Sequence, residues 1–136
     1  DRSPSRGLGD VYKRQSYNFA THTRNEHRTE VKAANVIILD GIFALCYPEL
    51  YRLLDLKIFL DVDADVRVVR RIGRDMAERG RDFNSCTQQY LESVKEMHEK
   101  YIEPTKSNAD FVIPWRDYNE RAITYISELI SFELEK

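Results

Sequence analysis

The sequence lacks a long apolar run, a secretory signal and an excess of charge of one sign. Its longest apolar stretch, residues 36–45, is interrupted by Asp40 and Gly41 and is too short to span a bilayer. The 21 basic and 23 acidic residues leave a net charge of −2, which provides no general attraction for nucleic acid or for a membrane surface. We therefore expect a cytoplasmic protein with neither kind of partner.

Cysteine and histidine are also scarce. Cys46 and Cys86 are the only cysteines, and they show no paired spacing, so we expect free thiols in a reducing compartment. His22, His27 and His98 are scattered without the spacing of metal ligands, which disfavours a structural zinc site.

The length and the apolar pattern predict one α/β domain. A chain of 136 residues suits a single domain with a modest core. Continuous apolar runs, rich in β-branched residues and typical of buried parallel strands, occupy residues 35–39, 57–62 and 110–114. Helical patterns occupy residues 48–54, a segment from about 64, residues 84–101 and residues 119–132. This alternation predicts a parallel sheet flanked by helices.

The first residues differ in character from the rest. Residues 1–15 combine proline, glycine, serine and charge without apolar periodicity, which is typical of a disordered leader. We interpret them as a disordered or non-native leader, with residues 16–136 forming the domain.

The segment that follows the run at 57–62 has helical periodicity. Val66, Val69, Ile72 and Met76 recur at steps of three and four, which predicts a buried helical stripe. Gly80 then predicts the end of this helix.

Arginines gather in the same segment, at positions 67, 70, 71, 74, 79 and 81. Like charges this close repel one another, so the arrangement suits a polyanion held between them. A solvated helix face with carboxylate pairs is the alternative, and the charge pattern alone does not decide. The position favours the anion, because a helix that leaves the end of a buried strand lies where α/β folds open their ligand crevice.

Four stretches in one order, "YNFATHTR", "ANVIILDGIFAL", "KIFLDVDADVRVVRRIGRDMAERGRD" and "PTKSNADFVIP", resemble the uridine–cytidine kinase family of P-loop kinases. The resemblance implies transfer of the γ-phosphate of ATP, with Mg²⁺, to the 5′-hydroxyl of uridine or cytidine in pyrimidine salvage. It also implies an incomplete P-loop kinase-type sheet with an arginine-rich lid, an N-terminal hairpin-like segment and a homo-oligomer.

The resemblance assigns residues to the nucleoside. It implies a pyrimidine pocket lined by Tyr17, Phe19 and His22, although Asn18 replaces the usual Asp, and further contacts from Arg71, Arg81, Gln89 and Tyr90. From the residues alone, hairpin packing of the two aromatic rings and a surface histidine would be favoured.

The resemblance also assigns residues to ATP. Arg74 and Arg79 match lid arginines that meet the phosphates and act in catalysis. Asp40 stands where the family has a Glu that holds Mg²⁺, and Tyr118 stands where an Asp is expected near the adenine, so adenine would stack on Tyr118 or Trp115.

One motif of the family is absent. No Gly-x-x-x-x-Gly-Lys-Ser/Thr loop occurs in the sequence, although ATP phosphates are held by that loop. We therefore expect the C-terminal portion of a kinase, without the general base and without kinase activity of its own. Two alternatives stay open: another P-loop small-molecule kinase, such as a phosphoribulokinase-like protein, and a non-catalytic regulatory or scaffolding domain.

Overall fold

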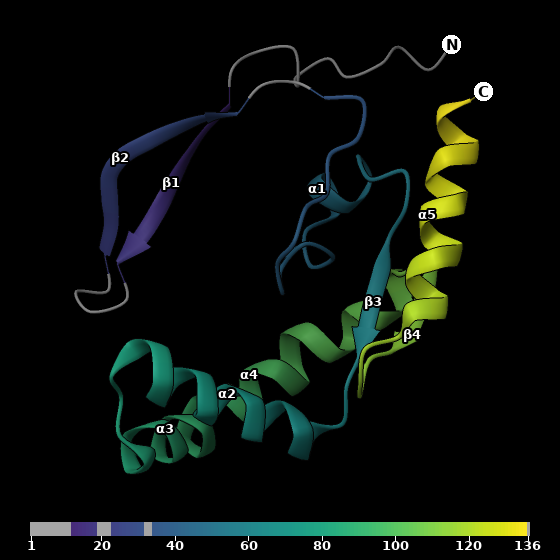
Figure 1. Ribbon diagram of the computed structural model, residues 1–136. Helices are drawn as coiled ribbons and strands as arrows, with labels where there is room; N and C mark the ends of the chain where they lie inside the picture. The colour runs from purple at the N-terminus through teal and green to yellow at the C-terminus, as the bar shows by residue number, and fades with distance from the viewer. Residues whose placement is uncertain (1–11, 19–22, 32–33, 136) are drawn as a thin grey trace. The chain divides into compact units, whose positions relative to one another are not determined.

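The computed structural model describes residues 12–18, 23–31 and 34–135. The chain divides into two compact units, Asp1–Ile38 and Leu39–Lys136. The first unit holds an antiparallel hairpin, and the second holds helices and a small parallel sheet (Figure 1). The α/β class predicted from the alternation of apolar runs and helical patterns is confirmed.

The hairpin of the first unit consists of β1 (Tyr12–Asn18) and β2 (Thr23–Val31), paired antiparallel. The N-terminal hairpin-like segment is therefore present. β1 runs across the predicted boundary at Gln15, so residues 12–15 of the predicted leader form part of a strand. Residues 1–11 of the predicted leader lie outside the described residues.

The sheet of the second unit is built from β3 (Ile58–Asp61) and β4 (Phe111–Pro114), which pair in parallel as predicted. A polar clamp fixes where the two strands begin. The Asp110 carboxylate accepts a hydrogen bond from the Lys57 backbone N–H at 2.8 Å and lies 2.9 Å from the Lys57 ammonium. In return, the backbone N–H of Asp110 donates to the Lys57 carbonyl at 2.8 Å. The pairing register therefore starts from a closed ring of contacts.

Two predictions about the strands are wrong. Residues 35–39 do not form a strand, and Ile38 is 83% exposed. An apolar run becomes a strand only when a neighbour takes up its N–H and C=O groups, and none of the described strands pairs with this one. β3 and β4 were predicted to be buried, yet Leu60 and Val112 are 51% and 45% exposed because no second layer in the described chain covers that surface.

The helices follow the predicted positions, with differences in length and type. They are α1 (Pro48–Tyr51), α2 (Ala64–Arg79), α3 (Phe83–Gln89), the π-helix η1 (Tyr90–Val94), α4 (Lys95–Met97), the π-helix η2 (His98–Ile102), the 3₁₀-helix η3 (Glu103–Asn108) and α5 (Glu120–Leu134). The single helix predicted over 84–101 is thus a continuous helical path with two π segments. Such segments often occur at functional sites.

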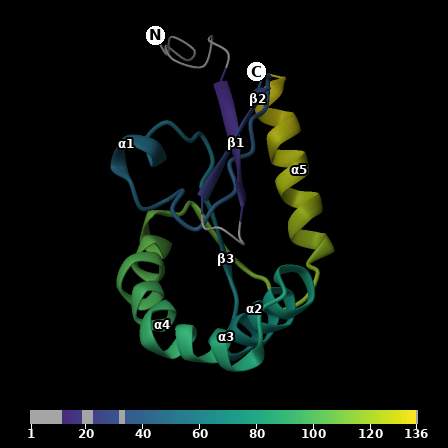
Figure 2. The ribbon, with the colours of Figure 1, turned by 90° about the vertical axis from the view of Figure 1, so that its left-hand side faces the viewer.

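The predicted buried stripe of α2 is not buried. Val69 and Met76 are 69% and 44% exposed, whereas Asp75 is fully buried. The reason is that α2 packs against α3 through side chains on its arginine-bearing face. In Figures 1 and 2, α2 leaves the lower end of β3, and the chain turns back through α3 and α4.

Away from this pair of helices, the buried apolar side chains are few. Leu45 and Ile102 are buried, and the Leu45 carbonyl accepts a hydrogen bond from Asn108 Nδ2 at 3.0 Å. The Cys46 thiol lies beside them and donates to the Tyr101 carbonyl at 3.3 Å. Within the ranges that the structure describes, no helix has both the length and the apolar character needed to cross a membrane.

Candidate functional site

The arginine segment folds into two helices joined by a tight turn. Gly80 follows the last residue of α2 with φ 63° and ψ 24°, in the left-handed region that glycine adopts most easily. The backbone N–H of Arg81 then donates to the Asp75 carbonyl at 3.2 Å. Asp82 caps α3 by accepting from the Ser85 N–H at 2.9 Å. The turn therefore brings Arg81 back toward the last turns of α2.

Four guanidinium groups meet one buried carboxylate, that of Asp75. Arg79 Nη1 lies 2.8 Å and Arg74 Nη2 lies 3.5 Å from Asp75 Oδ1. Arg81 Nη1 lies 3.5 Å and Arg71 Nε lies 3.8 Å from Oδ2. We call these five residues the arginine cluster. Its side chains carry a net positive charge, because one carboxylate serves four cations.

Gln89 connects the arginine cluster to α3. Its Oε1 accepts from Arg71 Nη2 at 3.1 Å and from Arg81 Nη1 at 2.6 Å. Arg81 Nη2 also donates to Ser85 Oγ at 3.0 Å. Beside these contacts is a hollow of about 270 Å³, lined by Arg81, Ser85, Gln88, Gln89 and Glu92. The cluster thus borders a surface hollow in which polar side chains predominate.

A second set of charged groups lies where β3 ends. Lys106 Nζ lies 2.9 Å from Asp61 and 2.9 Å from Glu103, and these hydrogen bonds raise the pKa of Lys106. Arg67 contacts the ring of His98, whose pKa is lowered by burial first and by Arg67 second. Sequence reasoning missed these contacts, because nothing local links residue 67 with residue 98.

The loop after β4 carries the predicted adenine residue. Arg70 donates to the carbonyls of Trp115 and Arg116, and Arg116 Nε donates to Asp63 at 3.1 Å. The rings of Trp115 and Tyr118 stand edge to face, with centroids 6.2 Å apart. Tyr118 is 75% exposed, so its ring face is accessible in the described chain.

The structure gathers several of the predicted site residues into one group. It brings Arg71, Arg74, Arg79, Arg81 and Gln89 together, as described above. The next residue, Tyr90, is half-buried at the start of η1.

Asp40 is exposed in a segment without regular structure, and the described residues contain no group of three or more His, Cys, Asp or Glu side chains able to hold a metal ion. Tyr17 lies in β1 of the other unit. Phe19 and His22 lie outside the described residues.

The site residues also include one that sequence reasoning underrated. Asp75 stands four residues after Arg71 and four before Arg79, a spacing that places ion pairs on one helix face. That spacing was the available signal. It indicated a surface pair, whereas the structure shows a fully buried carboxylate at the centre of the cluster.

Comparison with known proteins decides the family. The model of the phosphoribulokinase/uridine kinase family matches residues 7–122. The chain belongs to this family. It is 49% identical to a uridine kinase of Clostridium novyi (strain NT) over 115 residues, which cover 85% of this chain and 55% of that protein.

Other relatives agree. The chain is 44% identical to a uridine kinase of Clostridium perfringens (strain SM101 / Type A) over 94% of its own length and 62% of the relative. A uridine kinase of Staphylococcus aureus (strain JH9) is 45% identical over 85% of this chain and 58% of the relative. This member of the phosphoribulokinase/uridine kinase family therefore spans less than two thirds of these relatives.

Proposed function

We propose that this chain is the C-terminal part of a nucleoside kinase that transfers the γ-phosphoryl group of ATP to the 5′-hydroxyl of uridine or cytidine, in pyrimidine salvage. Membership of the family supports a kinase, and the relatives named uridine kinase support the nucleoside. The observation that carries the proposal is the convergence of four guanidiniums on Asp75, which makes a positively charged group at the turn between α2 and α3.

The arginine cluster suits phosphoryl transfer for an electrostatic reason. Catalysis of this reaction rests on positioning and on balancing the charge of the transferring group, rather than on covalent chemistry by the protein. Arg74 is the more exposed of the two proposed catalytic arginines, with 47% of its side chain accessible against 24% for Arg79. Arg74 would therefore meet an arriving phosphate first, and Arg79 would follow as water leaves.

The hollow beside Gln89 suits the sugar of a nucleoside. Both Arg71 and Arg81 donate to Gln89 Oε1, which leaves the amide nitrogen as the end that faces a substrate hydroxyl. The hollow has a volume of about 270 Å³, which is below the range of complete small-molecule pockets. Other segments of the protein would therefore complete it. Under the same proposal Tyr90 also contacts the nucleoside, and Tyr17, Phe19 and His22 contact its pyrimidine, as the resemblance implies.

Mg²⁺ would arrive with ATP. This cation keeps several waters and needs one or two carboxylates besides the phosphates, a requirement that the exposed Asp40 meets as a single ligand. When bound, the ion neutralises charge on the phosphates. Under the same proposal the exposed ring of Tyr118 stacks with adenine, and the complete protein is a cytoplasmic homo-oligomer with nucleoside and ATP as its small-molecule partners.

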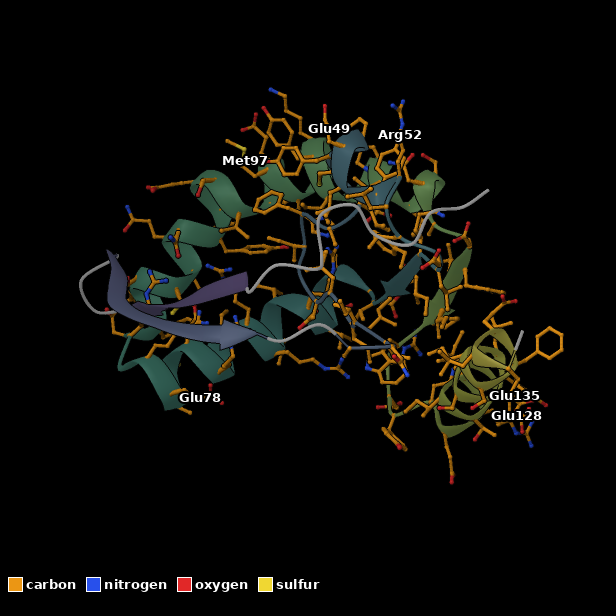
Figure 3. All side chains as sticks on the ribbon, turned by 90° about the horizontal axis from the view of Figure 1, so that it is seen from above. Glu49, Arg52, Glu78, Met97, Glu128 and Glu135 are labelled. Atoms are coloured by element: carbon orange, nitrogen blue, oxygen red, sulfur yellow. The ribbon has the colours of Figure 1, made fainter. Side chains whose placement is uncertain are left out.

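Uridine monophosphate formation by the complete gene product tests the proposal. Replacing Arg79 or Arg74 with alanine should lower kcat about 10³-fold, the scale of an arginine that stabilises a phosphoryl transition state. Arg52→Ala is the matched control, because Arg52 is exposed at the end of α1 and points outward in Figure 3. The 136-residue chain alone should form no product. Activity of that chain, or equal losses in all three variants, would refute the proposal.

A further inference from the structure

Asp75 is a charged side chain in an unusual place. Its exposed fraction is 0%, and it lies on α2, whose apolar residues Val69 and Met76 are exposed instead. Burial of a carboxylate is costly unless cations and hydrogen-bond donors surround it. Packing of apolar side chains would bury Val69 and not Asp75. The burial of Asp75 therefore needs a separate explanation.

The two oxygens of Asp75 are used differently. Oδ1 accepts from Arg79 Nη1 at 2.8 Å and from Arg74 Nη2 at 3.5 Å. Oδ2 has no hydrogen-bond partner within the described chain, and its nearest guanidinium nitrogens, from Arg81 and Arg71, lie 3.5 and 3.8 Å away. The carboxylate therefore orients one pair of arginines directly and attracts the other pair through its charge.

Asp75 also organises the turn through its backbone. Its carbonyl accepts from the N–H groups of Gly80 and Arg81. These two bonds close the turn and place Arg81 near the carboxylate of Asp75. A change confined to the Asp75 side chain would leave both backbone bonds in place.

We propose that Asp75 is the positioning residue of the arginine cluster: it holds the four guanidiniums around one point, so that an incoming polyphosphate meets donors that are already ordered. Arginine loses much rotamer freedom when it binds, and ordering before binding removes that cost from the binding step. The inference rests on the proposed function, because it takes phosphate as the ligand of the cluster.

A purely electrostatic view gives the opposite expectation. Asp75 carries a negative charge beside the proposed phosphate site, so its neutralisation would raise the net charge of the cluster and strengthen anion binding. Positioning instead predicts weaker binding after the same change. The sign of the effect distinguishes the two.

The test compares Asp75→Asn with Glu78→Gln in the 136-residue chain. Both changes remove one negative charge from α2. Glu78 is exposed, lies at the outer edge of α2 in Figure 3 and takes part in no ion pair of the described residues. Inorganic tripolyphosphate is the probe, and its affinity is measured by calorimetry. NMR signals of the arginine side chains, recorded without the probe, report how well those side chains are ordered.

We expect Asp75→Asn to weaken tripolyphosphate binding about tenfold, the equivalent of one charge-assisted hydrogen bond. In the same variant the separate NMR signals of the arginine side chains should merge toward one averaged position, because the side chains are no longer ordered. Glu78→Gln should leave the signals unchanged and the affinity equal or slightly higher. Binding by Asp75→Asn that is unchanged or tighter would overturn the inference. If the wild-type chain does not bind tripolyphosphate, the inference is overturned, whereas the proposed function is decided separately by uridine monophosphate formation in the complete gene product.

A third variant covers the case in which Asp75→Asn fails to fold by circular dichroism. Asp75→Glu keeps the charge and moves the carboxylate by one methylene. Positioning predicts about threefold weaker binding for this variant, because the geometry changes while the charge does not. Affinity equal to that of the wild type would refute the inference.

Discussion

The left-handed turn at Gly80 gives a prediction whose magnitude follows from its geometry. Gly80 has φ 63°, and a Cβ added there meets nothing within 4 Å. Gly80→Ala therefore introduces no steric contact and costs only the backbone energy of an L-residue in the left-handed region, roughly 1–2 kcal/mol. We therefore expect Gly80→Ala to lower the free energy of unfolding by roughly 1–2 kcal/mol in the part of the chain that contains the arginine cluster.

Gly73 supplies the matched control. It lies inside α2, and a Cβ added there also meets nothing within 4 Å. Alanine is favoured over glycine within a helix by about 1 kcal/mol, so Gly73→Ala should stabilise the same region. The two variants make the same chemical change and should move the free energy of unfolding in opposite directions, with a difference of about 2–3 kcal/mol between them.

Urea unfolding followed by far-ultraviolet circular dichroism measures both variants. The midpoints should shift in opposite directions while the slope of free energy against urea stays constant, because neither change alters the surface exposed on unfolding. Destabilisation by Gly73→Ala equal to that of Gly80→Ala would refute the reasoning, since it would show that added bulk, and not backbone conformation, decides the outcome.

Further predictions concern pH, capping and exposed apolar surface. Burial lowers the pKa of His98 below its ordinary value of 6.5, so as the pH falls the unfolded chain takes up this proton before the folded chain does. The free energy of unfolding should therefore decrease as the pH falls through 6.5. His98→Gln should make the urea midpoint depend less on pH over this range. Asn119 Oδ1 accepts from the Ala122 N–H at 3.1 Å, so Asn119→Ala should cost about 1 kcal/mol in the same assay. Leu60 is 51% exposed, so the dye ANS should fluoresce on this chain and less on Leu60→Ser, and equal fluorescence would contradict the exposure.

Local features were predictable from the sequence. The end of α2 at Gly80 lies where the pattern placed it, and α5 begins at Glu120, one residue after the predicted start, because both ends depend on residues within one turn of the helix. The strands β3 and β4 were also predictable from their apolar runs, and in the structure each is the parallel pairing partner of the other. The run at 35–39 is apolar and contains β-branched residues like the other two, yet it forms no strand, because pairing depends on a neighbour and not on the run itself.

Burial was not predictable to the same degree. The apolar periodicity correctly predicted the helix α2 with its apolar side chains along one face. It could not predict whether that face is buried, because burial requires another element to cover it. The position of Asp75 depends on Arg81, which returns only because Gly80 takes a left-handed conformation. A spacing rule for helices does not reach beyond the end of the helix, so it could indicate the pairs of Asp75 with Arg71 and Arg79 but not the pair with Arg81.

The choice between a solvated arginine face and an anion site can be argued from the acids that the cluster does not use. A solvated face would pair each arginine with its own carboxylate. Asp82 instead caps α3 through the Ser85 N–H, and Glu78 is exposed and forms no ion pair with the described residues. Four guanidiniums share Asp75, whereas Asp82 caps a helix and Glu78 pairs with none of them, so the segment keeps a positive charge that these two acids do not neutralise by direct contact. A retained charge of this kind is what recognition of a polyanion requires.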